Sequence, residues 1–372
     1  MALFMVKTWM GNKVTPIYGA EWAGGSDPSW SRTDDAVGFS APNPYYSGMS
    51  TTPSSPFDNI MPWSGMRRVT DASAGELVEI PKFYYKWTRD GVKMKLQISM
   101  SQFDGSHVSP AHADRGDGVG ERDYVYVGRY HCSSSNYKSA SGVTPKVNIT
   151  RATARTNIHN LGSSIWQLDF AMYWTINMLY LVEFASWNSQ AMIGYGCGNN
   201  SSLENNGASD TMPYHTGTMK SSRSTYGVGV QYRYVENWWA NAMNFVDGIY
   251  FAGSSNVDVY CIKNPANFSD TSGGTKVGTR STTSHIISKW TNPNANGFEY
   301  ALYPSECNGS DSTYVCDYSD YSSSAVMVGV GGGYSQGQIY GAFCLSGNKS
   351  ASSTTGTTGT RLMVLPSSRL SA

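Results

Sequence analysis

The sequence predicts an α+β protein with one dominant helix, many short strands and long loops. One long stretch, residues 165–187, carries apolar residues at helical spacing. Most of the remaining chain consists of short β-favouring runs separated by clusters of Gly, Ser, Asn and Thr. Apolar residues make up 40% of the 372 residues, and large aromatic residues occur along the whole length. We therefore expect a packed core rather than a disordered chain.

The N-terminal part of the sequence is predicted to form an irregular region with short β-strands, which serves as an attachment region or an extension. Residues 1–65 are rich in Pro, Gly, Ser and turn dipeptides, with short apolar pieces between them. We assign residues 66–372 to a ligand-binding domain. A strand is predicted at 77–87, where Pro81 favours an edge position or a bulge.

The dominant helix is predicted to begin at Ser163 or Ser164, either of which can act as its N-cap, and to end near Trp187. Its apolar residues recur at steps of three and four, at positions Ile165, Leu168, Met172, Ile176, Leu179 and Val182. A shorter helix is expected at 153–161, closed by Gly162. One or two further helical turns are expected near 236–245.

The last sixty residues alternate between predicted strands and permissive loops. Strands are expected at 325–330, 341–345 and 361–365, and the loops between them begin at Gly331 and Ser346. Loops of small polar residues and Tyr on a β scaffold are typical of recognition surfaces. We therefore interpret residues 317–365 as a segment of variable type that contacts a ligand.

The charge balance argues against nucleic acid as a partner. Lys and Arg total 27, as do Asp and Glu, so no basic field attracts a phosphate backbone. The most apolar stretch contains Asp169 and Glu183, which argues against membrane insertion. Residues 1–13 lack the pattern of a secretory signal, so an extracellular role requires release by lysis or by a dedicated route.

A glycine-rich acidic loop is the one candidate metal site in the sequence. Calcium is its candidate ligand, through the carboxylates of Asp114, Asp117, Glu121 and Asp123. Interleaved arginines and the departure from EF-hand spacing favour salt bridges and turn hydrogen bonds instead. His107 and His112 lie nearby, but structural or exposed roles are favoured over transition-metal binding. We therefore predict no cofactor, with calcium as the alternative.

Three further motifs are more consistent with structural roles than with catalysis. Residues 333–337 match the G-x-S-x-G elbow of hydrolases, but no His, Asp or Glu follows Ser335 to complete a triad in the order that fold requires. Trp238 and Trp239 are adjacent and followed by apolar residues, so core packing is favoured over sugar stacking. The six cysteines form no CxxC pair and are expected to be mostly free, packed thiols, with one late disulfide as the alternative.

Six short segments together resemble a known family: PWSGM at 62–66, IPKFYYK at 80–86, SPAH at 109–112, YLVEFA at 180–185, WNSQ at 187–190 and GTRL at 359–362. They are similar to the C-type-lectin-fold proteins of bacterial viruses and prophages. That group includes tail-tip receptor-binding proteins and the variable proteins of diversity-generating retroelements. The resemblance extends from about residue 15 to the end, and it implies a C-type-lectin-like fold shared with formylglycine-generating enzymes.

The resemblance also implies where a ligand would bind. In the retroelement proteins, randomised adenines turn Asn codons near the C-terminus into codons for Tyr, Ser, Asp, Gly, Thr and similar residues. The implied ligand-binding residues are Tyr318, Asp320, Tyr334, Gln336, Gln338, Tyr340, Ser346, Asn348, Lys349, Ser353 and Thr355. Gln and Lys do not arise from Asn codons, so Gln336, Gln338 and Lys349 depart from that pattern.

The sequence therefore leads to the hypothesis of a non-catalytic receptor-binding protein in a phage or prophage tail. Its expected partners are a host-surface protein or glycan and other virion tail proteins, and a homotrimer would suit a tail. One alternative is a structural baseplate or fibre subunit. The other is a copper-dependent oxidase of the formylglycine-generating type, but Cys307, Cys316 and Cys344 do not reproduce the close thiol pair that this chemistry needs.

Overall fold

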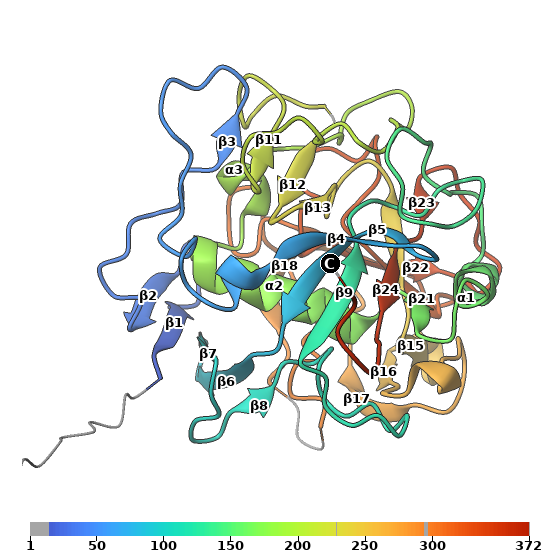
Figure 1. Ribbon diagram of the computed structural model, residues 1–372. Helices are drawn as coiled ribbons and strands as arrows, with labels where there is room; N and C mark the ends of the chain where they lie inside the picture. The colour runs from blue at the N-terminus through green and yellow to red at the C-terminus, as the bar shows by residue number, and fades with distance from the viewer. Residues whose placement is uncertain (1–14, 228, 294–296, 372) are drawn as a thin grey trace, which may run out of the picture.

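The fold is β-rich, with five sheets arranged around one buried helix (Figure 1). The computed structural model describes residues 15–227, 229–293 and 297–371. Strands account for 31% of the chain and helices for 10%. The predicted α+β class, with its C-type-lectin-like architecture and one dominant helix, is therefore wrong. The short runs between polar clusters pair into sheets more extensively than expected, and the central helix is shorter. The whole segment considered for a secretory signal, residues 1–13, lies outside the described residues.

The first sheet joins the N-terminal region to the following domain. Its strand order is β2-β1-β7-β6-β8. The strands are β1 (Ile17–Trp22), β2 (Ser31–Asp34), β6 (Tyr84–Asp90), β7 (Lys93–Ser99) and β8 (His107–Val108). In β7, Met94, Leu96 and Ile98 alternate with more exposed residues, as a strand with one buried face requires. The domain boundary at residue 65 stays a prediction, although β1 and β7 share this sheet.

The second sheet places the end of the chain among earlier strands, in the order β10-β24-β9-β5-β4. The strands are β4 (Arg67–Asp71), β5 (Gly75–Pro81), β9 (Tyr124–Gly128), β10 (Ile165–Gln167) and β24 (Leu362–Val364). The strand predicted at 77–87 is two strands in two sheets, because β5 ends at Pro81 and β6 begins at Tyr84. The predicted closing strand is confirmed as β24.

The remaining three sheets are built from the later half of the chain, together with β3 from the N-terminal region. A four-stranded sheet, ordered β13-β12-β11-β3, contains β3 (Tyr45–Tyr46), β11 (Gly217–Thr218), β12 (Val230–Tyr232) and β13 (Val235–Glu236). A three-stranded sheet contains β15 (Ile249–Ala252), β16 (Asp258–Cys261) and β17 (Thr275–Thr279). The largest sheet is ordered β19-β18-β20-β22-β21-β14-β23, with β14 (Met243–Val246), β18 (His285–Trp290), β19 (Pro304–Cys307), β20 (Tyr318–Tyr321), β21 (Met327–Val330), β22 (Leu345–Lys349) and β23 (Thr358–Gly359).

Helices are few in the described part of the chain: α1 (Arg151–His159), α2 (Phe170–Phe184), α3 (Ser189–Met192) and the 3₁₀ turns η1 (Trp63–Gly65), η2 (Ser254–Asn256) and η3 (Pro265–Asn267). The helix predicted at 153–161 is confirmed as α1, which begins slightly earlier behind its N-cap Thr150. The helical turns predicted near 236–245 are wrong. Asn237, Ala240 and Asn241 adopt positive φ angles there, which end any helical path.

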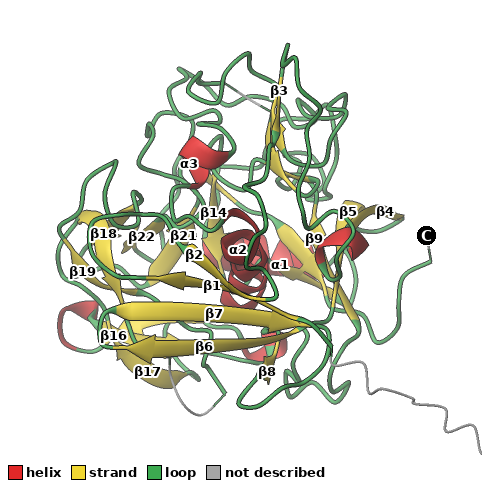
Figure 2. Ribbon diagram, turned by 90° about the vertical axis from the view of Figure 1, so that its left-hand side faces the viewer, coloured by secondary structure: helices red, strands yellow, loops and turns green. Residues whose placement is uncertain are grey.

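Helix α2 is shorter than the helix predicted from the sequence. Its apolar residues lie on all sides rather than along one stripe, so their spacing did not mark where the helix begins and ends. All fifteen of its residues are buried. Asp169, rather than Ser163 or Ser164, is the N-cap, and its side chain accepts a hydrogen bond from the Met172 amide. Ala185 ends the helix in a left-handed conformation. Figure 2 views α2 nearly end-on, with β1, β7 and β6 on one side of it.

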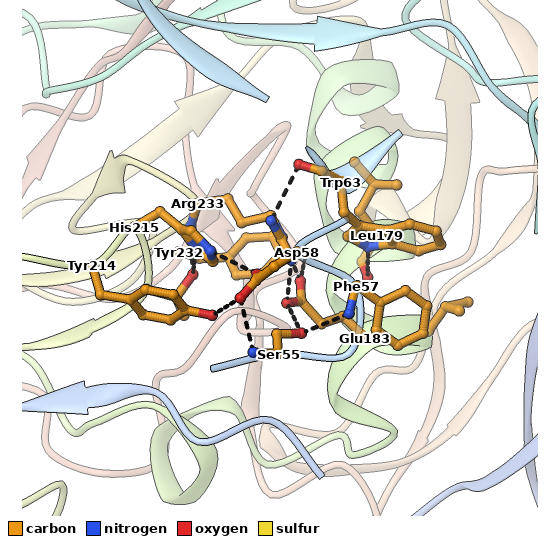
Figure 3. A network of polar contacts seen from close by, with 12 residues as sticks. Ser55, Phe57, Asp58, Trp63, Leu179, Glu183, Tyr214, His215, Tyr232 and Arg233 are labelled. Atoms are coloured by element: carbon orange, nitrogen blue, oxygen red, sulfur yellow. Dashed lines mark hydrogen bonds and ion pairs between the residues drawn. The ribbon is translucent and has the colours of Figure 1, made fainter. Parts of the chain in front are cut away.

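A buried ionic network holds the C-terminal end of α2 (Figure 3). Arg233 contacts both carboxylate oxygens of Glu183, at 2.6 and 2.7 Å, and it also binds the Trp63 carbonyl. The hydroxyls of Ser55 and Tyr232 donate to the same carboxylate. A carboxylate at a helix C-terminus is unfavourable on its own, so this cationic partner is what makes Glu183 tolerable in the core.

The network extends to Asp58 in the N-terminal region. Its carboxylate lies 2.8 Å from His215 Nε2 and 3.3 Å from Arg233 Nη2, and it accepts a hydrogen bond from the Tyr214 hydroxyl at 2.6 Å. Burial opposes ionisation of Asp58, but these hydrogen bonds and the histidine outweigh it and hold the pKa well below its usual value. Residues 55–58 are thereby fastened to the last turn of α2.

Replacing Arg233 tests this network. We expect Arg233→Met to lower the free energy of unfolding by about 3–5 kcal/mol, because Glu183 is left buried without a cation. Lys289→Met is the matched control: it breaks the exposed 2.6 Å pair with Glu306 and should cost about 1 kcal/mol or less. Urea unfolding followed by tryptophan fluorescence measures both changes. Equal effects of the two substitutions would refute the central role given to Arg233.

Candidate functional site

Most of the predicted ligand-binding residues gather where β20 and β22 run side by side. The two strands pair in parallel, which sets Asp320 opposite Ser346. The loop 331–340 lies next to them. We define the C-terminal face as the predicted residues that retain exposure here: Tyr318, Asp320, Tyr334, Gln336, Gln338, Tyr340, Asn348 and Lys349. Asn348 is exposed, and the other seven are partly buried.

Two tyrosine rings form the centre of this face. The Tyr318 and Tyr340 ring centroids are 5.6 Å apart, and the Tyr318 amide donates to the Ile339 carbonyl at 2.7 Å. The side chain of Gln336 forms a hydrogen bond with the Tyr340 hydroxyl, while burial raises the pKa of that hydroxyl well above its usual value. The face therefore offers a neutral hydroxyl and two ordered rings, which lose little entropy on binding a partner.

Ser346 differs from its predicted role as a contact residue because it is 1% exposed. Its hydroxyl lies 2.7 Å from Asp320 Oδ2 and 3.1 Å from Asn348 Oδ1. A hydroxyl has one proton, and the charged acceptor makes the stronger hydrogen bond. Ser346 therefore donates to Asp320 and positions that carboxylate from beneath the surface.

The loop that carries Tyr334 and Gln338 is fastened to neighbouring segments. The Asn200 amide donates to the Tyr334 carbonyl at 2.7 Å, and the Gly337 amide donates to the Gly198 carbonyl at 2.5 Å. The Gln338 side chain donates to Asp311 at 2.8 Å. The middle of this loop is thus held, while the side chains of Tyr334 and Gln338 stay partly exposed.

Ser353 and Thr355 belong to a separate turn. Ser353 accepts a hydrogen bond from the Ser350 amide at 2.9 Å, and the Thr355 carbonyl accepts one from the Asn148 amide at 3.0 Å. Within the described residues, no hydrogen bond or ring contact joins either side chain to Tyr318 or Tyr340. The structure therefore does not bring these two predicted residues into the central group.

The base of the face is built on α2 and Asp317. The Ala342 carbonyl accepts hydrogen bonds from Tyr173 and Asn177 of α2, at 3.0 and 3.1 Å. Asp317 accepts from the amides of Gly341 and Phe343, at 2.7 and 2.8 Å. A Cβ at Gly341 would lie 2.7 Å from Asp317 Oδ1, so this close approach requires glycine. Burial raises the pKa of Asp317 to about 7, against the opposing effect of the two amides.

Sequence reasoning missed several residues that border the face. Tyr195 and Tyr226 have ring centroids 5.0 Å apart, and the Tyr226 hydroxyl accepts a backbone hydrogen bond from Gln338. Arg280 lies over the Phe251 ring at 3.6 Å and over the Tyr321 ring at 4.8 Å. Tyr321 directly follows Asp320 in the polar run and could have been included. The other four are distant in sequence and carry no signal of proximity.

The carboxylates of the acidic loop are engaged by protein groups. Asp117 pairs with Arg122 at 2.5 Å, and Asp123 pairs with Lys82 at 2.7 Å. Glu121 lies 3.7 Å from Lys82, and Asp114 accepts a hydrogen bond from the Gly116 amide. Among the residues that the structure describes, no three His, Cys, Asp or Glu side chains are arranged to hold a metal ion. Salt bridges and turn hydrogen bonds, the favoured interpretation, are what this loop contains.

His112, the two tryptophans and the six cysteines considered for chemistry are buried, whereas His107 is exposed. His112 is fully buried, accepts from Ser109 and donates to the Ile80 carbonyl, and burial lowers its pKa to about 3. Trp238 and Trp239 are buried as predicted, with indole bonds to Asn177 and Gly194. All six cysteines are free and buried, which confirms the favoured prediction, and burial raises the pKa of every thiol.

The buried carboxyl of Asp317 predicts a specific pH dependence. Its folded-state pKa of about 7 exceeds the usual 3.8, so the folded protein binds the extra proton between these pH values. The contribution of Asp317 to the free energy of unfolding therefore falls by up to about 4 kcal/mol as the pH rises from about 4 to 7. Above pH 7 this contribution stays constant. Asp317→Asn should remove this part of the pH dependence.

Urea unfolding at pH 4.5, 6 and 8 measures the effect. The control is Asp311→Asn, which alters an exposed carboxylate beside the same face and should leave the profile unchanged. If the Asp317→Asn variant retained the pH profile of the original protein, the assignment of the raised pKa to Asp317 would be wrong.

Comparison with known proteins does not assign this chain to a family. No family model matches the chain, and no curated protein is similar to it. No helix in the described ranges has the length and apolar character needed to cross a bilayer.

Proposed function

We propose that this chain is a non-catalytic receptor-binding protein of a phage or prophage tail, and that its C-terminal face binds a host-surface protein or glycan. The observation that carries the proposal is the contrast between the partly exposed side chains of the C-terminal face and the bonded backbone beneath them. Partly exposed Tyr, Gln, Asp and Asn side chains lie over a base whose amides and carbonyls are bonded to Asp317 and α2. This combination supplies rigid rings and adaptable polar groups at low entropic cost.

The composition supports binding by contact rather than by long-range attraction. With 27 basic and 27 acidic residues, the chain carries no net field that would steer a charged partner. Individual contacts through such a face are modest, so several copies in a tail, for example a trimer, would increase the avidity. Within the virion, this chain would bind other tail proteins.

Replacing three residues of the face tests the proposal. We expect the Tyr334→Ala, Tyr340→Ala, Asn348→Ala triple variant to lose at least about 90% of binding to host cells, because it removes ring contact area and a hydrogen-bonding amide. Flow cytometry of labelled full-length protein on candidate bacterial hosts measures retention.

The matched control replaces two partly buried tyrosines and one exposed asparagine elsewhere: Tyr46→Ala, Tyr260→Ala and Asn136→Ala. It should bind like the original protein. Full binding by the C-terminal triple variant would contradict the assigned face. No binding by any form to any candidate host, with stable incorporation into tails, would support the alternative of a structural baseplate or fibre subunit.

We further propose that a retroelement diversifies this face. If so, sequencing many copies of the gene from one culture should show substitutions at the codons for Tyr318, Tyr334, Tyr340 and Asn348. The codon for the buried Asp317 should stay constant, because its carboxylate holds two backbone amides. Uniform sequences in a strain that expresses the associated reverse transcriptase would contradict diversification, and binding by the face would remain testable as above.

A further inference from the structure

A second concavity, separate from the C-terminal face, lies beside β6 and β8. Its volume is about 300 Å³, and its walls come from Tyr85, residues 102–121, Lys263 and residues 297–300. None of the residues of the C-terminal face lines it. The volume is at the lower end of the range of about 300–1,000 Å³ that is typical of small-molecule pockets.

Two buried tyrosines line this pocket with unused hydroxyls. Tyr85 is 1% exposed and Tyr300 is 6% exposed. No hydrogen bond joins either hydroxyl to another residue in the described part of the chain, although most other deeply buried tyrosine hydroxyls have partners, as in Tyr173 and Tyr232. Burial raises the pKa of both hydroxyls well above its usual value, so both keep their protons. Buried hydroxyls that line a pocket without a partner among the described residues indicate a partner that is supplied from outside.

The pocket contains charged groups of both signs. Asp114, Glu121 and Glu299 contribute carboxylates, and Lys263 and Arg115 contribute cations. Arg115 is already paired with Asp169, and its Nε donates to the Lys263 carbonyl at 2.7 Å. Glu299 Oε1 accepts from the Gly297 amide, and Glu299 Oε2 lies 3.9 Å from His107 Nδ1. One oxygen of Glu299 is thus only weakly engaged.

This mixture selects a neutral ligand that both donates and accepts hydrogen bonds. An anion such as phosphate would lie against three carboxylates, and an organic cation would lie against Lys263 and Arg115. Ligand hydroxyl groups can donate to the carboxylates and accept from Lys263, while the tyrosine hydroxyls can act in either sense. A compact polyhydroxylated molecule therefore satisfies every class of polar group in the wall.

We propose that this pocket binds one neutral sugar ring, free or as a unit of a surface glycan. Its hydrogen-bond partners are the hydroxyls of Tyr85 and Tyr300, the Glu299 carboxylate and the Lys263 ammonium group, all of which belong to residues that line the pocket. The site is independent of the C-terminal face and goes beyond the receptor binding proposed above, since it assigns a carbohydrate subsite to a different part of the fold.

Saturation-transfer NMR with the full-length protein tests the pocket. The probes are glucose, galactose, mannose, rhamnose and N-acetylglucosamine, with inorganic phosphate and choline as charged comparisons. We expect at least one neutral sugar to bind, with a dissociation constant on the order of 1 mM, because so small a ligand buries little surface. Neither charged probe should bind.

Tyr300→Phe is the decisive variant because it keeps the ring and removes only the hydroxyl. We expect it to weaken sugar binding about 3- to 10-fold while leaving the fold intact, since no residue that the structure describes forms a hydrogen bond with this hydroxyl. Tyr85→Phe provides a second, independent variant. Tyr303→Phe is the matched control: its hydroxyl donates to the Val277 carbonyl at 3.0 Å and its residue does not line the pocket, so sugar binding should persist.

The C-terminal triple variant separates the two proposals. It should keep the sugar signal, and Tyr300→Phe should keep any binding to a protein receptor. The pocket assignment is overturned if no neutral sugar binds, if phosphate or choline binds instead, or if neither Tyr300→Phe nor Tyr85→Phe weakens the sugar signal. If the C-terminal triple variant lost sugar binding while Tyr300→Phe and Tyr85→Phe kept it, the sugar site would lie on the C-terminal face, and the assignment to this pocket would be wrong.

Discussion

The complete burial of α2 is the constraint on which the rest of the structure depends. A helix that contacts water on no side must find protein partners for its charged groups. Asp169 at its start is paired with Arg115, and Glu183 at its end is paired with Arg233. Arg32 donates to the carbonyls of Val182 and Glu183 at the same end. Sheets on several sides follow from the same requirement, because every face of the helix is apolar and needs cover.

The middle of this helix determines the shape of the C-terminal face. Tyr173 and Asn177 hold the Ala342 carbonyl, and Trp238 donates to Asn177 Oδ1 at 2.8 Å. The backbone at 341–343 therefore has a fixed position, while the side chains of Tyr334, Gln336 and Gln338 in the adjacent loop are partly exposed. Substitutions at the tips, such as Tyr334, change what is presented. Substitutions at Gly341 or Asp317 change whether the loop is presented at all.

The sequence predicted those elements that are marked by residues within or next to them. Helix α1 and the closing strand β24 follow from the closing Gly162 and an apolar run. The single strand predicted at 77–87, with an edge or bulge at Pro81, is instead β5 and β6 in two sheets. The fold class was wrong because a helix that is apolar on all sides gives no stripe, and because short strands reveal their partners only in space. The pairing of Asp320 with Ser346 and the meeting of Tyr85 with Tyr300 result from long-range contacts, which no spacing in the sequence encodes.

Both proposed recognition sites are fastened to the same helix at different points. Arg115 lines the sugar pocket and pairs with the N-cap of α2, while the C-terminal face is held at Ala342 by the helix interior. Because a fully buried helix has little freedom to move, the two sites keep a fixed separation. A glycan or glycoprotein long enough to reach both would then bind the second site at a high effective concentration. A sugar pocket too weak to hold a monosaccharide tightly would thus still add strongly to the affinity for a cell surface.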